Sequence, residues 1–184
     1  DGIETLFHHD KMMLSYGIAK NSFLGNRIGF VEESPFIKTN KKCTYPTWLM
    51  SSKVGVIHAS VLNLIGSTIK SDSNFDYFLN SIAKVGMILG LLCYSEPQLL
   101  LHGSEDMPHK EANLFVLFRF VKQHYKKRWI VLLLLNLLVF EKRFPLFPFL
   151  YSLFFKNRKK AALNLDSIPV QSTLAIIAKK TIDV

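Results

Sequence analysis

The chain has 184 residues, of which 49% are hydrophobic and 20% are charged. This length allows one domain with a small appendage, and the apolar content excludes disorder for most of the chain. Seven prolines and nine glycines without a period exclude collagen-like and linker-type sequences. Cys43 and Cys93 are too few for a disulfide framework or a four-cysteine zinc site. We therefore expect reduced thiols in a cytosolic protein, with a single structural disulfide as the alternative.

The formal net charge of +9 is concentrated near the C-terminus. Between positions 113 and 160 the only acid is Glu141, whereas eleven residues are basic. That segment therefore carries +10 and the rest of the chain −1. The basic residues are Arg119, Lys122, Lys126, Lys127, Arg128, Lys142, Arg143, Lys156, Arg158, Lys159 and Lys160. Such a segment requires an anionic partner, which is either nucleic acid or an acidic membrane.

The residues between these charges favour the membrane. Trp129–Phe140 and Phe144–Phe155 are solid apolar blocks bounded by cations, whereas a nucleic-acid groove would interleave single aromatics with basic residues. Twelve helical residues reach about 18 Å, too short for a hydrocarbon core of about 30 Å. We expect an in-plane or shallowly inserted helix pair with these membrane-contacting residues: Arg128, Trp129, Phe140, Arg143 and Phe144.

Two alternatives for this segment stay open. The apolar blocks are equally compatible with buried core helices of a soluble domain. RNA binding through the cationic tail is a weaker alternative, so nucleic acid is not the favoured partner.

The first ten residues are acidic and lack a basic start followed by an apolar run, so they do not form a secretory signal. The chain also lacks an initiating Met. We expect a processed product or a piece of a longer protein. The adjacent His8 and His9 are a poor chelating pair, because a zinc helix uses i, i+4 spacing.

Several elements can be placed from the spacing of apolar and turn residues. Arg27–Val31 is the best strand in a loop-rich region, and Tyr45–Met50 is extended because Pro46 disfavours helix before it. Apolar spacing predicts helices from Ser51 or Ser52 to Ile65, from Phe75 to Lys84 with Gly86 as the stop, and from Lys110 to Lys127 with Asp106 as a plausible cap. Met87–Tyr94 reads as a buried strand.

These elements predict an α/β or α+β fold, dominated by helices, with a small central sheet. A helical, basic C-terminal segment follows. We divide the chain into a domain over residues 1–109, a basic and apolar helical segment over 110–160, and a tail over 161–184.

The order of short motifs in the middle of the chain is more specific than any one of them. In sequence these are Tyr45-Pro46-Thr47-Trp48-Leu49-Met50, a helix ending at Gly66, Asn74-Phe75-Asp76-Tyr77-Phe78-Leu79-Asn80, Gly86-Met87-Ile88, Glu96-Pro97 and His102-Gly103. This order resembles the second, acceptor-side half of the bacterial family-2 glycosyltransferases that build cell-surface polysaccharide. The resemblance covers about Cys43 to Lys127 and implies an incomplete GT-A-like half.

The resemblance implies transfer of a sugar from a nucleotide-sugar donor to a saccharide acceptor, lipid-linked or part of a polysaccharide, at the cytoplasmic face of the membrane. It implies a carboxylate at the start of the second helix as general base, here Asp76 or, with a loop shift, Asp72. The substrate-binding candidates are Thr47, Trp48, Asn74 and His102. A divalent metal, Mg or Mn, is expected only where a DxD motif neutralises the leaving diphosphate.

The chain departs from the family pattern at several positions. It contains no DxD, Asn74 stands at the position of the family's base, and Asn80 stands at that of its Arg. Two interpretations remain: the chain is the acceptor half of a longer enzyme, or a divergent copy that has lost catalysis. In either case we expect this chain alone to be inactive. The competing hypothesis is a non-enzymatic module that binds a membrane surface or another protein.

Overall fold

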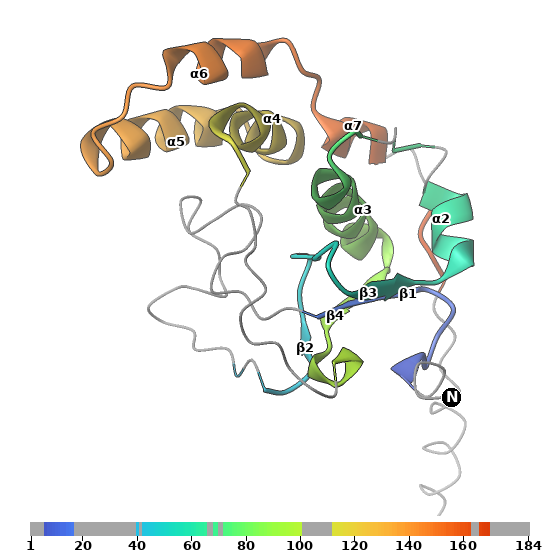
Figure 1. Cartoon of the computed structure of the whole chain (residues 1–184). Helices are drawn as coiled ribbons and strands as arrows, with labels where there is room; N and C mark the ends of the chain where they lie inside the picture. Colours follow the sequence, from blue (N-terminus) through green and yellow to red (C-terminus); the bar gives the residue numbers. More distant parts are fainter. Residues whose placement is uncertain are drawn as a thin grey trace, which may run out of the picture.

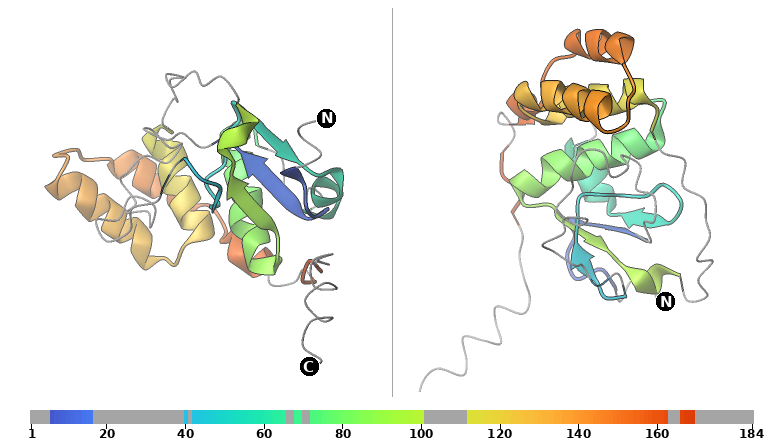
Figure 2. Two further views of the ribbon diagram at one scale, coloured as in Figure 1. Left: turned by 90° about the horizontal axis from the view of Figure 1, so that it is seen from below. Right: turned by 90° about the vertical axis from the view of Figure 1, so that its left-hand side faces the viewer.

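The computed structural model of the chain describes residues 6–16, 40, 42–65, 68–69, 72–100, 112–162 and 166–169. In these residues a small sheet lies under helix α3 (Phe75–Leu89), and α3 packs against α4 (Leu114–His124). Helices α5 (Arg128–Val139) and α6 (Leu146–Leu153) pack on α4, with α6 forming the outermost layer (Figures 1 and 2). The sheet is therefore separated from α5 and α6 by α3 and α4.

The sheet has four strands in the order β2-β4-β1-β3. They are β1 (Met12–Ser15), β2 (Tyr45–Pro46), β3 (Gly55–Ile57) and β4 (Leu92–Ser95). Strand β1 runs parallel to β4 and antiparallel to β3, and β2 pairs with β4 in the antiparallel sense. All four residues of β1 are buried, as expected for an inner strand with neighbours on both sides. The apolar run at Met12–Leu14 thus forms a central strand, which the sequence alone did not assign.

The remaining described helices are short: α2 (Ala59–Ile65), the 3-10 turn η3 (Pro97–Leu99) and α7 (Arg158–Ala162). The predicted fold class, helix-dominated α/β with a small sheet, is confirmed. The predicted strand at Arg27–Val31 and the predicted domain boundary near residue 109 lie outside the described residues.

The predicted helix from Ser51 or Ser52 to Ile65 is wrong in its first half. Gly55–Ile57 is strand β3, and only Ala59–Ile65 is helical. The backbone of this segment pairs with β1, joining Ile57 to Met13 and Gly55 to Ser15. Pairing of this kind overrides helical periodicity over a short stretch. His58 consequently lies just before α2, where its Nδ1 accepts the Ser60 N–H.

Gly86 does not end α3, contrary to the prediction. The helix continues to Leu89 and stops at Gly90, whose φ of 105° is the left-handed conformation that glycine tolerates best. Strand β4 therefore starts at Leu92 and not at Met87. Gly86 is needed for close packing instead, because a Cβ there would lie 2.5 Å from Cδ2 of Leu91 and 3.1 Å from Cδ1 of Ile65.

Helix α4 is shorter than the predicted span from Lys110 to Lys127. Asn113 caps it, since its side-chain oxygen accepts the Val116 N–H, and the helix ends at His124 before an extended Tyr125. Lys110 and Asp106, the latter considered as a cap, lie outside the described residues. In the cationic run at positions 126–128, Lys126 and Lys127 precede α5 and Arg128 begins it.

Two apolar clusters fill the interior. The first lies between the sheet, α2 and α3, and includes Ile168 from the C-terminal tail, whose N–H donates to the Leu89 carbonyl at 2.6 Å. The second joins Tyr77 of α3 to the inner faces of α4 and α5. Trp48 packs against both clusters, so the segment after β2 holds the two halves of the interior together.

His124 is a fully buried titratable group that contacts Tyr77 and Phe120 of the second cluster. Its Nε2 lies 3.0 Å from Oγ of Ser81, and its ring contacts that of Phe120 in a tilted arrangement with the ring centres 4.3 Å apart. Burial, aided by the nearby charges of Arg158, Lys84 and Lys159, lowers the pKa of His124 to about 3. The neutral ring is therefore the form that the folded chain accommodates.

The burial of the neutral His124 ring predicts that the fold loses stability in acid. Because unfolding returns His124 to its ordinary pKa of 6.5, the unfolded chain takes up a proton first as the pH falls. The free energy of unfolding should then fall below pH 6.5, by up to about 1.4 kcal/mol per pH unit from this group. Urea titrations of wild type and His124→Gln from pH 7 to about pH 4 should show a steeper loss in wild type. Parallel curves would contradict the assignment.

Candidate active site

The segment that follows β2 meets the start of α3, and these are the two places where the sequence locates its candidate residues. The Ser52 N–H donates to Oδ1 of Asp76 at 2.9 Å. Asn80, one turn further along α3, is fully buried. Its amide accepts the Met50 N–H at 3.1 Å and donates to the Met50 carbonyl at 2.8 Å. These bonds hold residues 50–52 against the helix.

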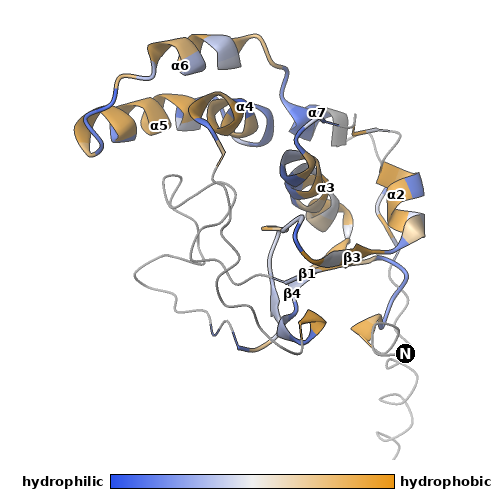
Figure 3. Cartoon of the chain, in the orientation of Figure 1, coloured by the Kyte–Doolittle hydropathy of each residue, from blue (hydrophilic) through white to orange (hydrophobic). Residues whose placement is uncertain are grey.

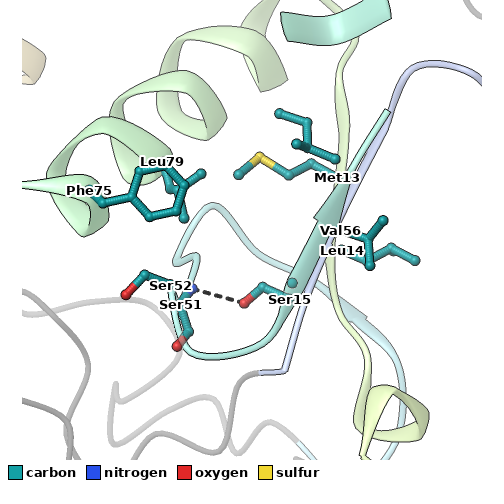
Figure 4. A pocket seen from close by; sticks show the side chains of 10 residues that line it. Met13, Leu14, Ser15, Ser51, Ser52, Val56, Phe75 and Leu79 are labelled. Atoms are coloured by element: carbon teal, nitrogen blue, oxygen red, sulfur yellow. Dashed lines mark hydrogen bonds between the residues drawn. The ribbon is translucent and has the colours of Figure 1, made fainter. Parts of the chain in front are cut away.

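A small pocket opens beside this junction (Figure 4). Its volume is about 80 Å³, and it lies between β1, β3, the Ser51–Ser52 turn and the first turns of α3. Ser15, Ser51 and Ser52 give it polar groups, and Phe75 and Leu79 form an apolar wall. Sites for whole drug-sized ligands are several-fold larger. The pocket can therefore accept one end of a ligand, such as part of a sugar ring, and not a whole nucleotide-sugar.

Neither of the two predicted carboxylates lines this pocket, but Asp76 is linked to it through Ser52. Asp76 is in the first turn of α3, partly exposed, and its partner Ser52 lines the pocket. The carboxylate is thereby oriented by a backbone N–H, as a general base or a hydroxyl-binding group must be. A carboxylate in the first turn is also stabilised by the helix dipole, which explains Asp76 without any ligand.

Asp72 instead has a structural role. One of its oxygens forms an ion pair with Nη2 of Arg119 at 2.6 Å, and the other accepts the Asn74 N–H at 3.0 Å. The Arg119 guanidinium in turn lies 4.1 Å from the ring centre of Tyr77, whose hydroxyl donates to Gln123. Asp72 therefore fixes the start of α3 to α4, and catalysis by Asp72 would require this ion pair to break.

Thr47 and Asn74 both have local structural roles. The Thr47 hydroxyl accepts the Leu49 N–H at 3.0 Å, its own N–H donates to the Cys93 carbonyl, and the residue is buried. Asn74 is the N-cap of α3, because its side-chain oxygen accepts the Tyr77 N–H at 3.0 Å. These bonds shape the backbone around Asp76 and explain why the residues are there.

Trp48, in the segment that follows β2, is also a predicted substrate-binding residue. Its ring is stacked on Phe120 at 5.7 Å, and the Lys84 ammonium lies 4.1 Å from its centre. The same ammonium lies 4.9 Å from the ring of Tyr125. Burial, with a smaller contribution from Lys159, lowers the pKa of Lys84 to about 8. Trp48 thus has the contacts of an aromatic residue at the edge of the core.

Some candidates cannot be placed, and others were not foreseen. His102 lies outside the described residues. Within the described ranges, no three His, Cys, Asp or Glu side chains gather as metal ligands. Sequence reasoning passed over Ser15, Phe75 and the buried role of Asn80. Only Asn80 carried a signal, since it stands at the position of the Arg in the resembling family.

The residues predicted to contact a membrane are all at the surface. Arg128, Trp129, Arg143 and Phe144 are exposed, and Phe140 is 80% exposed. They lie at the start of α5 and in the turn between α5 and α6. Among the described helices, none has both the length and the apolar content to cross a bilayer.

No protein-family model, curated protein or solved structure matches the chain. The geometry of the site and the order of the sequence motifs are therefore the two observations that bear on its function.

The hydrogen bonds of the Asn80 amide predict how a substitution there changes the free energy of unfolding. Asn80→Ala removes both bonds to Met50 and leaves its buried N–H and carbonyl without this partner, so we expect a loss of about 2–4 kcal/mol in the free energy of unfolding. Urea denaturation measures this loss. The matched control is Asn63→Ala on the exposed face of α2, which should change the value by less than about 0.5 kcal/mol. Equal effects of the two changes would contradict the role of Asn80.

Proposed function

We propose that the chain is the acceptor-side part of a family-2-type glycosyltransferase, which acts on a lipid-linked or cell-surface saccharide at the cytoplasmic face of the membrane. The observation that carries this proposal is the hydrogen bond that orients the Asp76 carboxylate, because its donor Ser52 lines a small pocket at the junction of α3 with residues 50–52. The motif order supports it. The resemblance assigns functional residues to the segment after β2 and to the start of α3, and these two segments are in contact.

In this proposal Asp76 binds an acceptor hydroxyl and takes its proton as the hydroxyl attacks the sugar. The Ser52 N–H keeps one carboxylate oxygen oriented, and Phe75, which is mostly exposed at the pocket edge, offers an apolar surface to a sugar ring. The donor and any divalent metal would be held by residues outside this unit. The chain has no DxD, and the pocket at Ser52 is too small for a nucleotide-sugar.

A second function has its own support. Asp72 is held in an ion pair with Arg119, and the pocket is small. Both features are also expected of a divergent unit that has lost catalysis. In that case the chain would serve only to bind a membrane surface or a protein. The two functions differ in one property, which is binding of a saccharide at Asp76.

Saccharide binding can be tested by saturation-transfer NMR with glucose, galactose, N-acetylglucosamine and rhamnose as separate probes. We expect at least one sugar to bind in the millimolar range. Asp76→Asn should weaken that binding at least about tenfold, because a hydrogen bond to a charged group contributes about 1.5–3 kcal/mol.

The matched control is Asp10→Asn, which removes an exposed acid whose carboxylate lies 3.1 Å from Nζ of Lys11. It should leave the sugar signal unchanged. The absence of binding for all four sugars, or equal signals in the Asp76 and Asp10 variants, would favour the non-enzymatic function.

A further inference from the structure

Helix α6 is apolar on its outer side as well as its inner side. Pro148 and Ser152 are buried toward α4, and Phe149 packs edge-on against Phe118. The outward side chains are large and hydrophobic, and they recur at i, i+3 and i+4 spacing: Leu146, Phe147, Leu150, Tyr151, Leu153 and Phe154. Phe147 is 79% exposed and Phe154 is 87% exposed. A helix that is hydrophobic all round is normally covered on every side.

The neighbouring helix continues this pattern. Val131, Leu132, Leu135 and Val139 of α5 are exposed, and Phe140 and Phe144 flank the turn that joins α5 to α6. Figure 3 shows both helices as predominantly hydrophobic along their length. We call the exposed apolar residues of α5, α6 and their turn the α5–α6 face. Exposed apolar surface on this scale marks an interaction site.

The charges around the α5–α6 face are almost all positive. Lys126, Lys127 and Arg128 precede or begin α5, Lys142 and Arg143 form the turn, and Lys156 follows α6; all are exposed. Glu141 is the only acid between positions 113 and 160, and its carboxylate lies 3.9 Å from Nε of Arg143. The rim of the face is therefore complementary to a negatively charged surface.

We propose that the α5–α6 face docks on the surface of an anionic lipid bilayer. The aromatic and aliphatic side chains of α6 and the turn enter the boundary between headgroups and acyl chains, while the rim cations contact lipid phosphates. The two helices span about 18 Å and 12 Å, so they lie along the surface. This contact does not require sugar transfer, so vesicle binding and saccharide binding can fail independently.

A second copy of the chain fits this face less well. Joining two copies would bring two cationic rims together, and juxtaposed like charges oppose association. A bilayer supplies both an apolar layer and a dense array of negative charge, which matches the order of apolar and basic residues along positions 126–156.

The first experiment is flotation of the full chain with two kinds of vesicle at low salt. One contains phosphatidylcholine alone, and the other has about 30% phosphatidylglycerol. We expect strong binding only to the anionic vesicles, weakening as salt is raised. Trp129 should be quenched by brominated lipid, because it is exposed on α5, whereas Trp48 is partly buried against Phe120.

Paired variants separate the apolar and cationic contributions. Phe147→Ser with Phe154→Ser should reduce binding at least about tenfold, since both side chains are exposed and leave the core intact. The control is Ile88→Ser, an exposed apolar residue of α3 outside the face.

The cationic rim is tested separately. Lys142→Asn with Arg143→Gln should reduce binding by about tenfold or more. The control is Lys42→Asn with Lys53→Gln, which removes two cations elsewhere on the surface.

Circular dichroism establishes that each variant is folded. Equal binding to neutral and anionic vesicles, binding to neither, or equal effects of the face variants and their controls would overturn the proposal. Sedimentation velocity provides the remaining outcome: a wild-type dimer that the Phe147 and Phe154 changes dissociate would assign the face to a second copy.

Discussion

The two-way hydrogen bond between the Asn80 side chain and the Met50 backbone is the interaction on which the candidate site depends. Residues 47–52 form neither helix nor strand, although the Thr47 N–H donates to the Cys93 carbonyl of β4. A buried amide from α3 satisfies this backbone and also donates to the Asp76 carbonyl at 2.7 Å. Because these polar groups are removed from water, the bonds set a single position for the segment, and Ser52 thereby reaches Asp76.

This constraint also explains why Asn stands where the resembling family has Arg. A guanidinium has only donors and cannot accept the Met50 N–H, so the two-way bond requires an amide. The side chain at position 80 of this chain therefore has a structural role. The same holds for Asn74, which caps α3 and cannot act as a base, leaving Asp76 as the carboxylate that is linked to the pocket through Ser52.

The sequence predicted what depends on local pattern and missed what depends on partners far along the chain. The helical character of residues 75–84 and 114–124 followed from apolar spacing, and the exposed cations around α5 and α6 followed from their clustering. Strand β3 was mistaken for helix because its conformation is set by pairing with β1. Gly86 was read as a stop because the close approach of Leu91 and Ile65 is a tertiary contact. The roles of Asp72 and Trp48 likewise depend on α4, about fifty or more residues away.

The layered arrangement connects the two surfaces of the molecule. Asp72 is tied to Arg119 of α4, and α6 packs on the same helix. Helix α4 therefore has α3, with its candidate site, on one side and the α5–α6 face on the other. Helix axes in contact are about 8–10 Å apart, so a bilayer against α6 would lie roughly two helix layers from α3. A saccharide that reaches Asp76 would then have to extend outward from its lipid anchor, which favours the distal sugars of a growing chain over the sugar nearest the lipid.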